Sequence, residues 1–414
     1  MPGGPGGSAA GSGATWAPVY ADLHVHLGWA GEPGGGVKIP AARDLTLPNI
    51  LKECRDRKGI GMIGVIDAAT SGALTDLRRL LAAGEVAELP GGGLAYQGEV
   101  TLLPGAEMEV EHGGKPVHLL GYVPGLRELE ELAAWSKERV KNTQLSTQRH
   151  HHTTAAELTA FIGSLGGIVI PAHIFTPFKA ILGAAHSIGE VIPAELWRFV
   201  PAAELGLSSD TGWADELPEL ADFTFVTGSD SHSLGKIARE YNELYVAAPT
   251  FTELVLALRG EKGRRVAANY GLDPRLGKYH RTYCLTCDRR LEGEPPVLTC
   301  PVDPDHRLVL GVVDRIRYYR VLQGEVSRLP RFRRRRPPYV HQIPLQFVPG
   351  LGKKGLERLL AAFGSEMAVL HRATAEALTE VVGPRLADLV VRAREGRLDV
   401  EAGGGGIYGK IVSE

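Results

Sequence analysis

Residues 20–27 read YADLHVHL, an apolar stretch in which Asp22, His24 and His26 alternate with hydrophobic side chains. Successive side chains of a β-strand point to opposite faces, so the three polar groups share one face of a strand. Two histidines on one face can chelate a single cation through two imidazoles. The stretch therefore predicts a buried strand that carries part of a metal site.

Short apolar runs alternate with longer helical patterns throughout residues 16–272. Helices are predicted over residues 47–59, 76–89, 155–167 and 251–260, and buried strands over residues 20–27, 61–67, 166–171 and 223–228. Such alternation is typical of an α/β protein with a parallel sheet or barrel. We therefore expect residues 16–272 to form one α/β domain.

The predicted strands deliver side chains that bind metals. These candidate ligands are His24, His26, Asp67, Glu107, His118, His173, Asp230 and His232. A single histidine is more often an ordinary core or surface residue, but here ligands recur at the ends of separate strands, where barrel enzymes place their catalytic groups. Mixed imidazole and carboxylate donors suit Zn²⁺ or Mn²⁺, and eight ligands imply two or three ions. Clustered ions of this kind suit phosphoryl hydrolysis.

The order of these motifs resembles the PHP superfamily of metallo-phosphoesterases. HVH, the glutamate of GAEMEV, the histidines of VHLLGY and IPAH, and the SDSH segment carry the resemblance across residues 16–272. It implies a distorted TIM-like barrel with its metals at the C-terminal mouth, and a catalytic role for His24, Glu107 and Asp230. Many PHP proteins have a histidine after the second-motif aspartate and an acidic residue soon after HxH. Here Ala68 follows Asp67, and Glu32 is only a weak substitute, so the ligands of a third metal stay open.

Three of the four cysteines lie late in the chain with metal-ligand spacing. Cys284 and Cys287 form a CxxC pair, with Cys300 and His306 downstream. Two such pairs can fold a small module around a structural Zn²⁺, which we expect over residues 278–313. Imidazole binds zinc better than a lone carboxylate, so His306 is preferred to Asp303 as the fourth ligand. Cysteines used in this way indicate a reducing cytoplasm, and Cys54 is expected to be an inert thiol.

The formal net charge of −2 conceals a basic region. Residues 275–340 contain fifteen Lys and Arg against seven Asp and Glu, and residues 331–336 read RFRRRR. Such a stretch is either a polyanion-binding surface or a solvated linker, here expected over residues 314–338. We take Arg333 and Arg334 as candidate DNA contacts.

Residues 339–414 have a helical pattern, and the segment FVPGLGKKGLERLLAAFG has the form of a helix–hairpin–helix motif. The turn at Gly350 and Gly352 exposes backbone N–H groups that can hold a phosphate, with Lys353 and Lys354 beside them. The alternative is an ordinary helical hairpin in a bundle.

Two further stretches are expected to play no part in the site. His150–His152 are expected to form an exposed turn. Residues 1–15 are expected to be a flexible tail and not a signal peptide. No apolar run reaches the length of a membrane span.

Taken together, the modules resemble the endonuclease Q family of the PHP superfamily over almost the whole chain. The segments ELGLSSDT, REYNELY, GVVDRI and YVHQIPL add to the match. The resemblance implies a DNA repair endonuclease that cleaves 5′ to uracil, hypoxanthine, xanthine or an abasic site. Its partner would be DNA, duplex or single-stranded, in the cytoplasm at the nucleoid; no protein partner follows.

Parts of the sequence also fit two other functions. A PHP-type small-molecule phosphatase leaves the cysteine module, the arginine run and the hairpin without a purpose. A non-catalytic DNA-binding protein with a decayed barrel conflicts with the retained ligands, because decay removes ligands first.

Overall fold

The computed structural model describes residues 16–31, 34–324 and 336–412 of the chain. Its centre is a ten-stranded mixed sheet. The strands of this sheet are β1 (Val19–Val25), β4 (Met62–Val65), β5 (Val86–Glu88), β6 (Leu94–Tyr96), β7 (Val100–His112), β8 (Lys115–Tyr122), β9 (Ile168–Pro171), β12 (Tyr241–Tyr245), β13 (Arg265–Gly271) and β17 (Tyr339–His341). They pair in the order β17-β13-β12-β1-β4-β7-β6-β5, and β8 joins β7 to β9.

The sheet curls into a distorted barrel. A separate parallel pair, β10 (Ala202–Glu204) and β11 (Thr224–Val226), stands between β9 and β1. The segment after β11 is tied to β1, because the N–H of His26 donates to the carbonyl of Ser231 (3.2 Å) and the N–H of Ser231 to that of His24 (3.2 Å). These bonds close the ring of strands and confirm the α/β barrel.

The pairing is mixed, whereas the sequence pattern suggested parallel strands throughout. Strands β1, β4 and β7 are parallel neighbours, but β7, β8 and β9 pair in antiparallel fashion. The reason is local: only Gly113 and Gly114, both with positive φ, separate β7 from β8, and so short a connection forms a hairpin.

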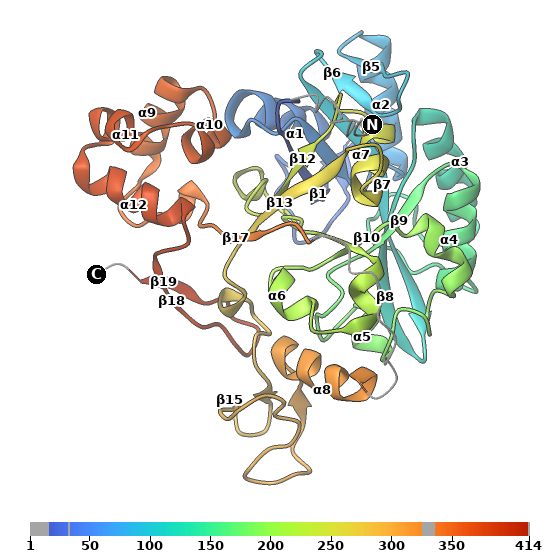
Figure 1. The fold of residues 1–414 in the computed structure, drawn as a ribbon. Coiled ribbons are helices and arrows are strands. Elements are labelled where there is room, and N and C mark those ends of the chain that lie inside the picture. Colours follow the sequence, from blue (N-terminus) through green and yellow to red (C-terminus); the bar gives the residue numbers. More distant parts are fainter. Residues whose placement is uncertain (1–15, 32–33, 325–335, 413–414) are drawn as a thin grey trace, which may run out of the picture.

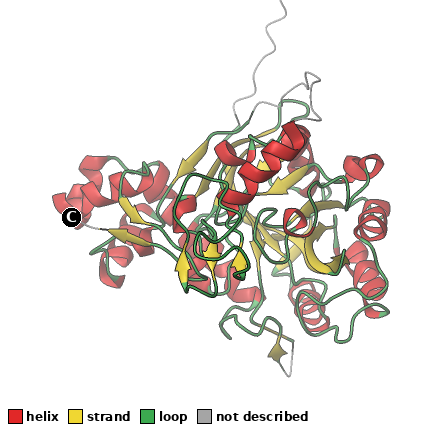
Figure 2. Ribbon diagram, turned by 90° about the horizontal axis from the view of Figure 1, so that it is seen from below, coloured by secondary structure: helices red, strands yellow, loops and turns green. Residues whose placement is uncertain are grey.

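Helices cover the outside of the barrel (Figures 1 and 2). They are α1 (Leu47–Glu53), continued by a π-helical turn (Cys54–Lys58), α2 (Ser71–Ala82), α3 (Leu126–Lys137), α4 (Ala155–Ser164), α5 (Ile181–Ala184), α6 (Thr211–Ala214) and α7 (Phe251–Arg259). Helix α4 begins with a capping box formed by Thr154 and Glu157. The helix expected over residues 76–89 ends earlier, since the chain turns at Gly84 (φ 71°) and continues as β5.

The cysteine-containing segment forms a small three-stranded sheet of β14 (Tyr283–Cys284), β15 (Arg289–Arg290) and β16 (Leu308–Val309). Helix α8 (Val312–Gly324) follows, where the sequence suggested that a basic linker begins. The helix forms because it has a partner: the hydroxyl of Tyr319 donates to the carbonyl of Leu182 (2.9 Å), and Ile316 is buried.

The C-terminal part is helical between residues 353 and 394, in α9 (Lys353–Phe363), α10 (Glu366–His371), α11 (Ala375–Val382) and α12 (Pro384–Arg394). The expectation of an all-helical domain over residues 339–414 is wrong at both ends. Strand β17 belongs to the barrel sheet, where it pairs with β13. Strands β18 (Asp399–Glu401) and β19 (Lys410–Val412) form a hairpin that returns toward the barrel (Figure 1). No helix in the described part of the chain is long and apolar enough to cross a membrane.

Two neighbouring ion pairs join the barrel to the C-terminal helices. Arg57 pairs with Glu357 at 2.9 Å on the surface, while Lys58 pairs with Glu366 at 2.9 Å in the interior. The Lys58 and Glu366 side chains are 3% and 6% exposed. The imidazole of His371 stacks on Tyr20 beside them, with ring centroids 4.5 Å apart. The helices are therefore packed against the barrel.

Removing one partner of the buried pair is expected to destabilise the protein much more than removing one partner of the surface pair. Glu366→Ala leaves a buried ammonium without its carboxylate, which costs about 3–5 kcal/mol. Glu357→Ala, the matched control, breaks a pair whose glutamate is 46% exposed and should cost at most about 1 kcal/mol. Urea denaturation followed by tryptophan fluorescence measures both, and equal midpoints for the two variants would contradict this account.

Candidate metal centre

Strand β1 carries His24 and His26 into the barrel, where both side chains are buried. The Nδ1 atom of His24 lies 2.9 Å from the carboxylate of Glu204, and that of His26 lies 3.0 Å from the carboxylate of Asp67. An ionised carboxylate only accepts hydrogen bonds, so Nδ1 carries the proton in both rings. The Nε2 atoms are left as the free ligand positions, as in many metal-binding histidines.

Seven of the eight expected ligands come together in three overlapping groups. Within each group the ligand atoms lie within 4.8 Å of one another. The groups are His24, His26 and Glu107; His26, Asp230 and His232; and Glu107, His118 and His173. Because His26 and Glu107 each belong to two groups, the three form one continuous cluster. Such a cluster suits neighbouring cations, as in two-metal hydrolases.

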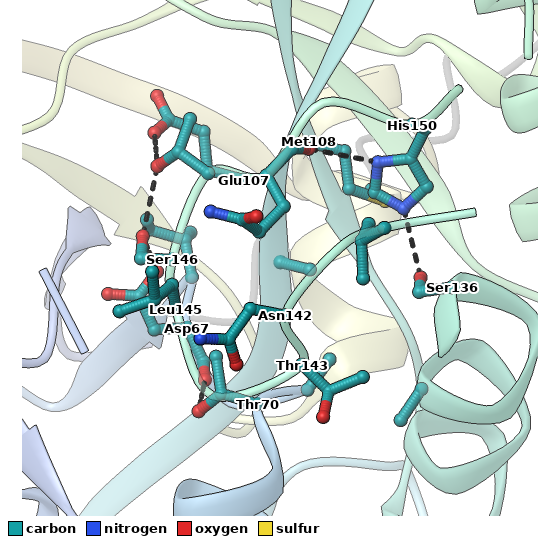
Figure 3. A pocket seen from close by; sticks show the side chains of 17 residues that line it. Asp67, Thr70, Glu107, Met108, Ser136, Asn142, Thr143, Leu145, Ser146 and His150 are labelled. Atoms are coloured by element: carbon teal, nitrogen blue, oxygen red, sulfur yellow. Dashed lines mark hydrogen bonds between the residues drawn. The ribbon is translucent and has the colours of Figure 1, made fainter. Parts of the chain in front are cut away.

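Asp67, the eighth expected ligand, has a different position. Its carboxylate accepts hydrogen bonds from the N–H of Leu27 (2.7 Å), from the ring of His26 and from the hydroxyl of Ser146. None of the three ligand groups found among the described residues includes it. Through these bonds Asp67 orients His26, and Figure 3 shows it beside Ser146.

Several residues between 140 and 150 line the pocket drawn in Figure 3, among them Ser146, Thr147 and His150. The hydroxyl of Thr147 donates to Glu107 (2.6 Å). His150 was expected in an exposed turn, but it is buried between Ser136 (3.0 Å) and the carbonyl of Gln148 (3.1 Å). This burial lowers the pKa of His150 to about 4. Only His151 and His152 are exposed as expected.

The electrostatics of the cluster favour positive charge. Burial on its own would lower the pKa of His24, but the carboxylates of Glu204, Asp230 and Glu107 outweigh it and raise this pKa to about 10. Burial would raise the pKa of Glu107 and of Asp230, yet the surrounding histidines hold both well below their usual range. The buried Nε2 of His24 also has no hydrogen-bond partner among the described residues. A cation bound there would satisfy this atom and the carboxylates together, so the residues fit divalent metals.

Two ligand residues have strained backbones. His173 (φ 31°) and Asp230 (φ 44°) adopt left-handed conformations that cost non-glycine residues of order 1–3 kcal/mol. Hydrogen bonds hold them there: Glu204 accepts from the N–H of His173 (2.9 Å), and Arg239 donates to the carbonyl of Ser229 (2.6 Å) next to Asp230. Strain of this kind concentrates at functional sites.

Some supporting residues were missed from the sequence. Glu204 binds both His24 and the backbone of His173, but it lies in a strand of only three residues with no local ligand pattern. Lys38, whose ammonium lies 3.3 Å from Glu107, comes from a loop without any motif. Asp22 shares the strand with the histidines, as expected, but it accepts from the N–H groups of Ser229 (3.1 Å) and Ala238 (2.8 Å). It therefore positions the segment that carries Asp230.

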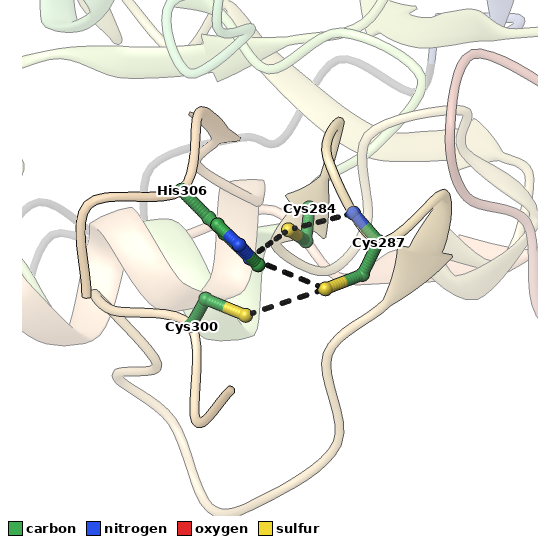
Figure 4. A group of neighbouring side chains, drawn as sticks. All are labelled: Cys284, Cys287, Cys300 and His306. Atoms are coloured by element: carbon green, nitrogen blue, oxygen red, sulfur yellow. Dashed lines mark hydrogen bonds between the residues drawn. The ribbon is translucent and has the colours of Figure 1, made fainter. Parts of the chain in front are cut away.

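The second candidate metal site lies in the three-stranded module. Its ligand atoms come from Cys284, Cys287, Cys300 and His306 and lie within 4.8 Å of one another (Figure 4). The sulfurs of Cys287 and Cys300 are 3.8 Å apart, and Nδ1 of His306 lies 3.2 Å from that of Cys287. Asp303 remains outside this group. Four soft donors in this arrangement fit a closed tetrahedral zinc site.

The expected DNA contacts are only partly within the described residues. Lys353 and Lys354 are exposed in the first turn of α9, Gly352 precedes the helix, and Gly350 adopts a positive φ of 78°. Arg333 and Arg334, like Glu32, lie outside the described residues. Arg336, the last arginine of the run, has a structural role: it pairs with Asp215 (2.9 Å) and covers the ring of Phe225 at 3.9 Å.

Substitution of the cysteine-module ligands is expected to release one metal ion per chain. Cys284→Ser and His306→Ala each remove a donor from a site whose metal contributes folding free energy, so the melting temperature should also fall. Asp303→Ala is the matched control and should retain the metal. Inductively coupled plasma mass spectrometry and thermal melting measure both effects. Loss of zinc from Asp303→Ala with retention in His306→Ala would reverse the choice of the fourth ligand.

Two known proteins are similar to this chain in sequence. No protein-family model matches the chain. The chain is 46% identical over 400 residues to the uncharacterized protein YqxK of Bacillus subtilis, across 95% of this chain and 99% of that protein. It is 35% identical over 259 residues to the uncharacterized protein MJ0043 of Methanocaldococcus jannaschii, across 58% of this chain and 31% of that protein.

Solved structures extend the likeness to the fold of nearly the whole chain. The lesion-specific endonuclease PfuEndoQ from Pyrococcus furiosus matches with a TM-score of 0.78 and 27% identity, across 95% of each chain. Endonuclease Q in complex with a 27-mer duplex carrying an abasic lesion at its active site also matches with a TM-score of 0.78. Its identity is 28%, across 96% of this chain and 97% of that one. The chain belongs to the endonuclease Q family.

Proposed function

We propose that this protein is a DNA repair endonuclease that hydrolyses the phosphodiester on the 5′ side of a deaminated base or an abasic site. The observation that carries the proposal is the cluster of seven ligand residues at the barrel mouth. It lies in a chain whose fold matches, along nearly its whole length, an endonuclease bound to a duplex with an abasic lesion. A likeness this extensive includes the modules outside the barrel.

The cluster would hold two or three Zn²⁺ or Mn²⁺ ions through His24, His26, Glu107, His118, His173, Asp230 and His232. Bound ions of this kind lower the pKa of water and neutralise charge on phosphate oxygens. Side chains around the cluster would bind the DNA backbone and hold the ligands in position. Lys38, Lys179 and Lys278 line the cavity over the cluster and provide positive charge for the DNA backbone. Glu204 and Asp67 hold the two histidines of β1 in place.

The outlying modules would bind DNA without reading its sequence. A zinc ion in the cysteine module would hold its small sheet together, because so small a core folds poorly alone. The turn at Gly350 and Gly352, with Lys353 and Lys354, would contact a phosphate as a helix–hairpin–helix motif does. We divide the chain accordingly into a barrel (16–272), a zinc module (278–313) and a C-terminal DNA-binding part (339–414) whose first strand, β17, is added to the barrel sheet.

Lesion selection would rest on the cost of exposing a base. Extruding a nucleotide from the duplex costs a few kcal/mol, and least where the base is mispaired or damaged. A deaminated base opposite its original partner is mispaired, so it leaves the stack more readily. A pocket matched to the keto edge of uracil or hypoxanthine would reject cytosine and adenine, whose amino groups would leave buried polar atoms unpaired.

The substrate prediction is a single nick on the 5′ side of uracil or hypoxanthine, which leaves 3′-hydroxyl and 5′-phosphate ends and needs no glycosylase. The measurement uses end-labelled duplexes that contain uracil, hypoxanthine, an abasic site or no lesion, each with Mn²⁺ or Zn²⁺ and with EDTA. Asp230→Asn should abolish cleavage in every case and largely retain binding, because DNA contacts also lie on other modules.

Three results would count against this function. Release of free uracil would indicate a glycosylase. Equal cutting of damaged and undamaged strands would indicate a general nuclease. Full activity of Asp230→Asn would remove that residue from the site.

The hairpin prediction concerns salt dependence. Replacing Lys353 and Lys354 together with alanine should weaken binding about equally for all duplexes and lower the slope of log K against log salt by roughly one unit per lost phosphate contact. Arg358→Ala is the matched control, since it removes an exposed charge from the same helix one turn further on. Fluorescence anisotropy over a salt series measures the slope, and identical slopes for all three proteins would support an ordinary helical hairpin.

A further inference from the structure

The cavity over the metal cluster is also lined by residues that are not candidate metal ligands. Its lining includes both cluster residues and three aromatic residues, Phe178, Tyr279 and Tyr408. We propose that these three residues, here named the aromatic wall, stack against the base of the nucleotide extruded toward the metals. The proposal rests on the proposed function and names the residues that bind the lesion's base.

Phe178 is positioned by the same loop that carries a metal ligand. It lies five residues after His173, and the hydroxyl of Thr176 donates to its carbonyl (2.9 Å) while lying 3.2 Å from the ring of His173. The Phe178 side chain is 55% exposed. Its ring meets that of Tyr279 edge-on, with centroids 5.8 Å apart and planes at 77°. A large apolar ring is thus held open to solvent close to a half-buried candidate ligand.

Tyr408 reaches the cavity from the far end of the chain. It lies in the glycine-rich turn of the β18–β19 hairpin, which docks on residues 275–278. There the N–H groups of Gly403 and Gly409 donate to the carbonyls of Arg275 (2.7 Å) and Leu276 (2.9 Å). A Cβ on Gly403 would lie 2.7 Å from the carbonyl oxygen of Gly277, so the hairpin docks this closely only with glycine there. The Tyr408 side chain is left 39% exposed.

The charges around the aromatic wall point to a nucleotide. The ammonium of Lys278 lies 4.6 Å from the centre of the Tyr408 ring, and Lys38 and Lys179 line the same cavity. Aromatic faces stack on bases whatever their sequence, and ammonium groups bind the phosphates on either side. An apolar ligand would use the rings but make no use of the three ammonium groups. A simple phosphate would use the lysines but leave the rings exposed.

Comparing a uracil duplex with an abasic duplex isolates the contribution of base stacking, because the abasic site has the same backbone and no base. Stacking on an aromatic side chain contributes about 1–3 kcal/mol per base, which corresponds to about 5- to 150-fold. Phe178→Ala and Tyr408→Ala should therefore lower the ratio of kcat/KM for a uracil duplex to that for an abasic duplex by this factor. Ile407→Ala is the matched control: it removes a 72% exposed side chain from the same turn, and Ile407 does not line the cavity. It should keep the wild-type ratio.

The same comparison is made for binding, with the aromatic-wall substitutions placed in the cleavage-deficient Asp230→Asn protein and the dissociation constants measured by fluorescence anisotropy. The uracil-to-abasic preference should fall there as well. An unchanged preference in both assays, or an equal loss on both duplexes, would overturn the assignment of the aromatic wall. Failure of the wild-type protein to cut either lesion would instead refute the proposed function, and the aromatic wall with it.

Discussion

Two buried pairs of histidine and carboxylate, His24 with Glu204 and His26 with Asp67, fix the geometry on which the site depends. In each pair the carboxylate holds the proton on Nδ1 of the imidazole, and this fixes the direction in which the unprotonated Nε2 points. Burying a carboxylate is costly unless it is paired and hydrogen-bonded. Here Asp67 follows β4, the strand that pairs with β1, whereas Glu204 lies in the separate β10–β11 pair, so only the closed barrel brings both carboxylates to these histidines. Closing the barrel and forming the metal site are therefore the same structural event.

The change of partner along β7 gives the cluster its shape. The first residues of the strand pair in parallel with β4, and from Gly105 onward the strand pairs in antiparallel fashion with β8. Glu107 lies just after this change, where the sheet opens, and the hairpin brings His118 back to it at 2.8 Å. An all-parallel barrel would place a helix between these two residues. The mixed topology replaces it with a two-glycine turn and a rigid pair of strands.

How much was predictable depends on whether the signal was local. Alternation in YADLHVHL and ligands near the ends of apolar runs identified seven residues that the structure brings together. The spacing of Cys284, Cys287, Cys300 and His306 identified the second cluster. Glu204 and Lys38 could not be found in this way, because their roles come from contacts across the barrel. The same limit explains two misassigned segments. Helix α8 was expected to be mostly basic linker, and β17 was expected to belong to the helical domain, because their partners Leu182 and β13 lie far away in the sequence.

The cysteine module and the C-terminal hairpin are coupled through one short strip of chain. Residues 275–279 leave the barrel, accept the glycine-rich hairpin along their backbone and present Tyr279 to the cavity before the module begins. The module is anchored in turn, because the buried carboxylate of Asp314 in α8 accepts from the N–H groups of Thr282 (2.9 Å) and Val297 (2.8 Å). A shift of the module would therefore move the strip, and with it Tyr279 and the hairpin that carries Tyr408. The ligand cluster comes from the barrel alone, whereas the aromatic wall also needs residues 275–279 and the C-terminal hairpin.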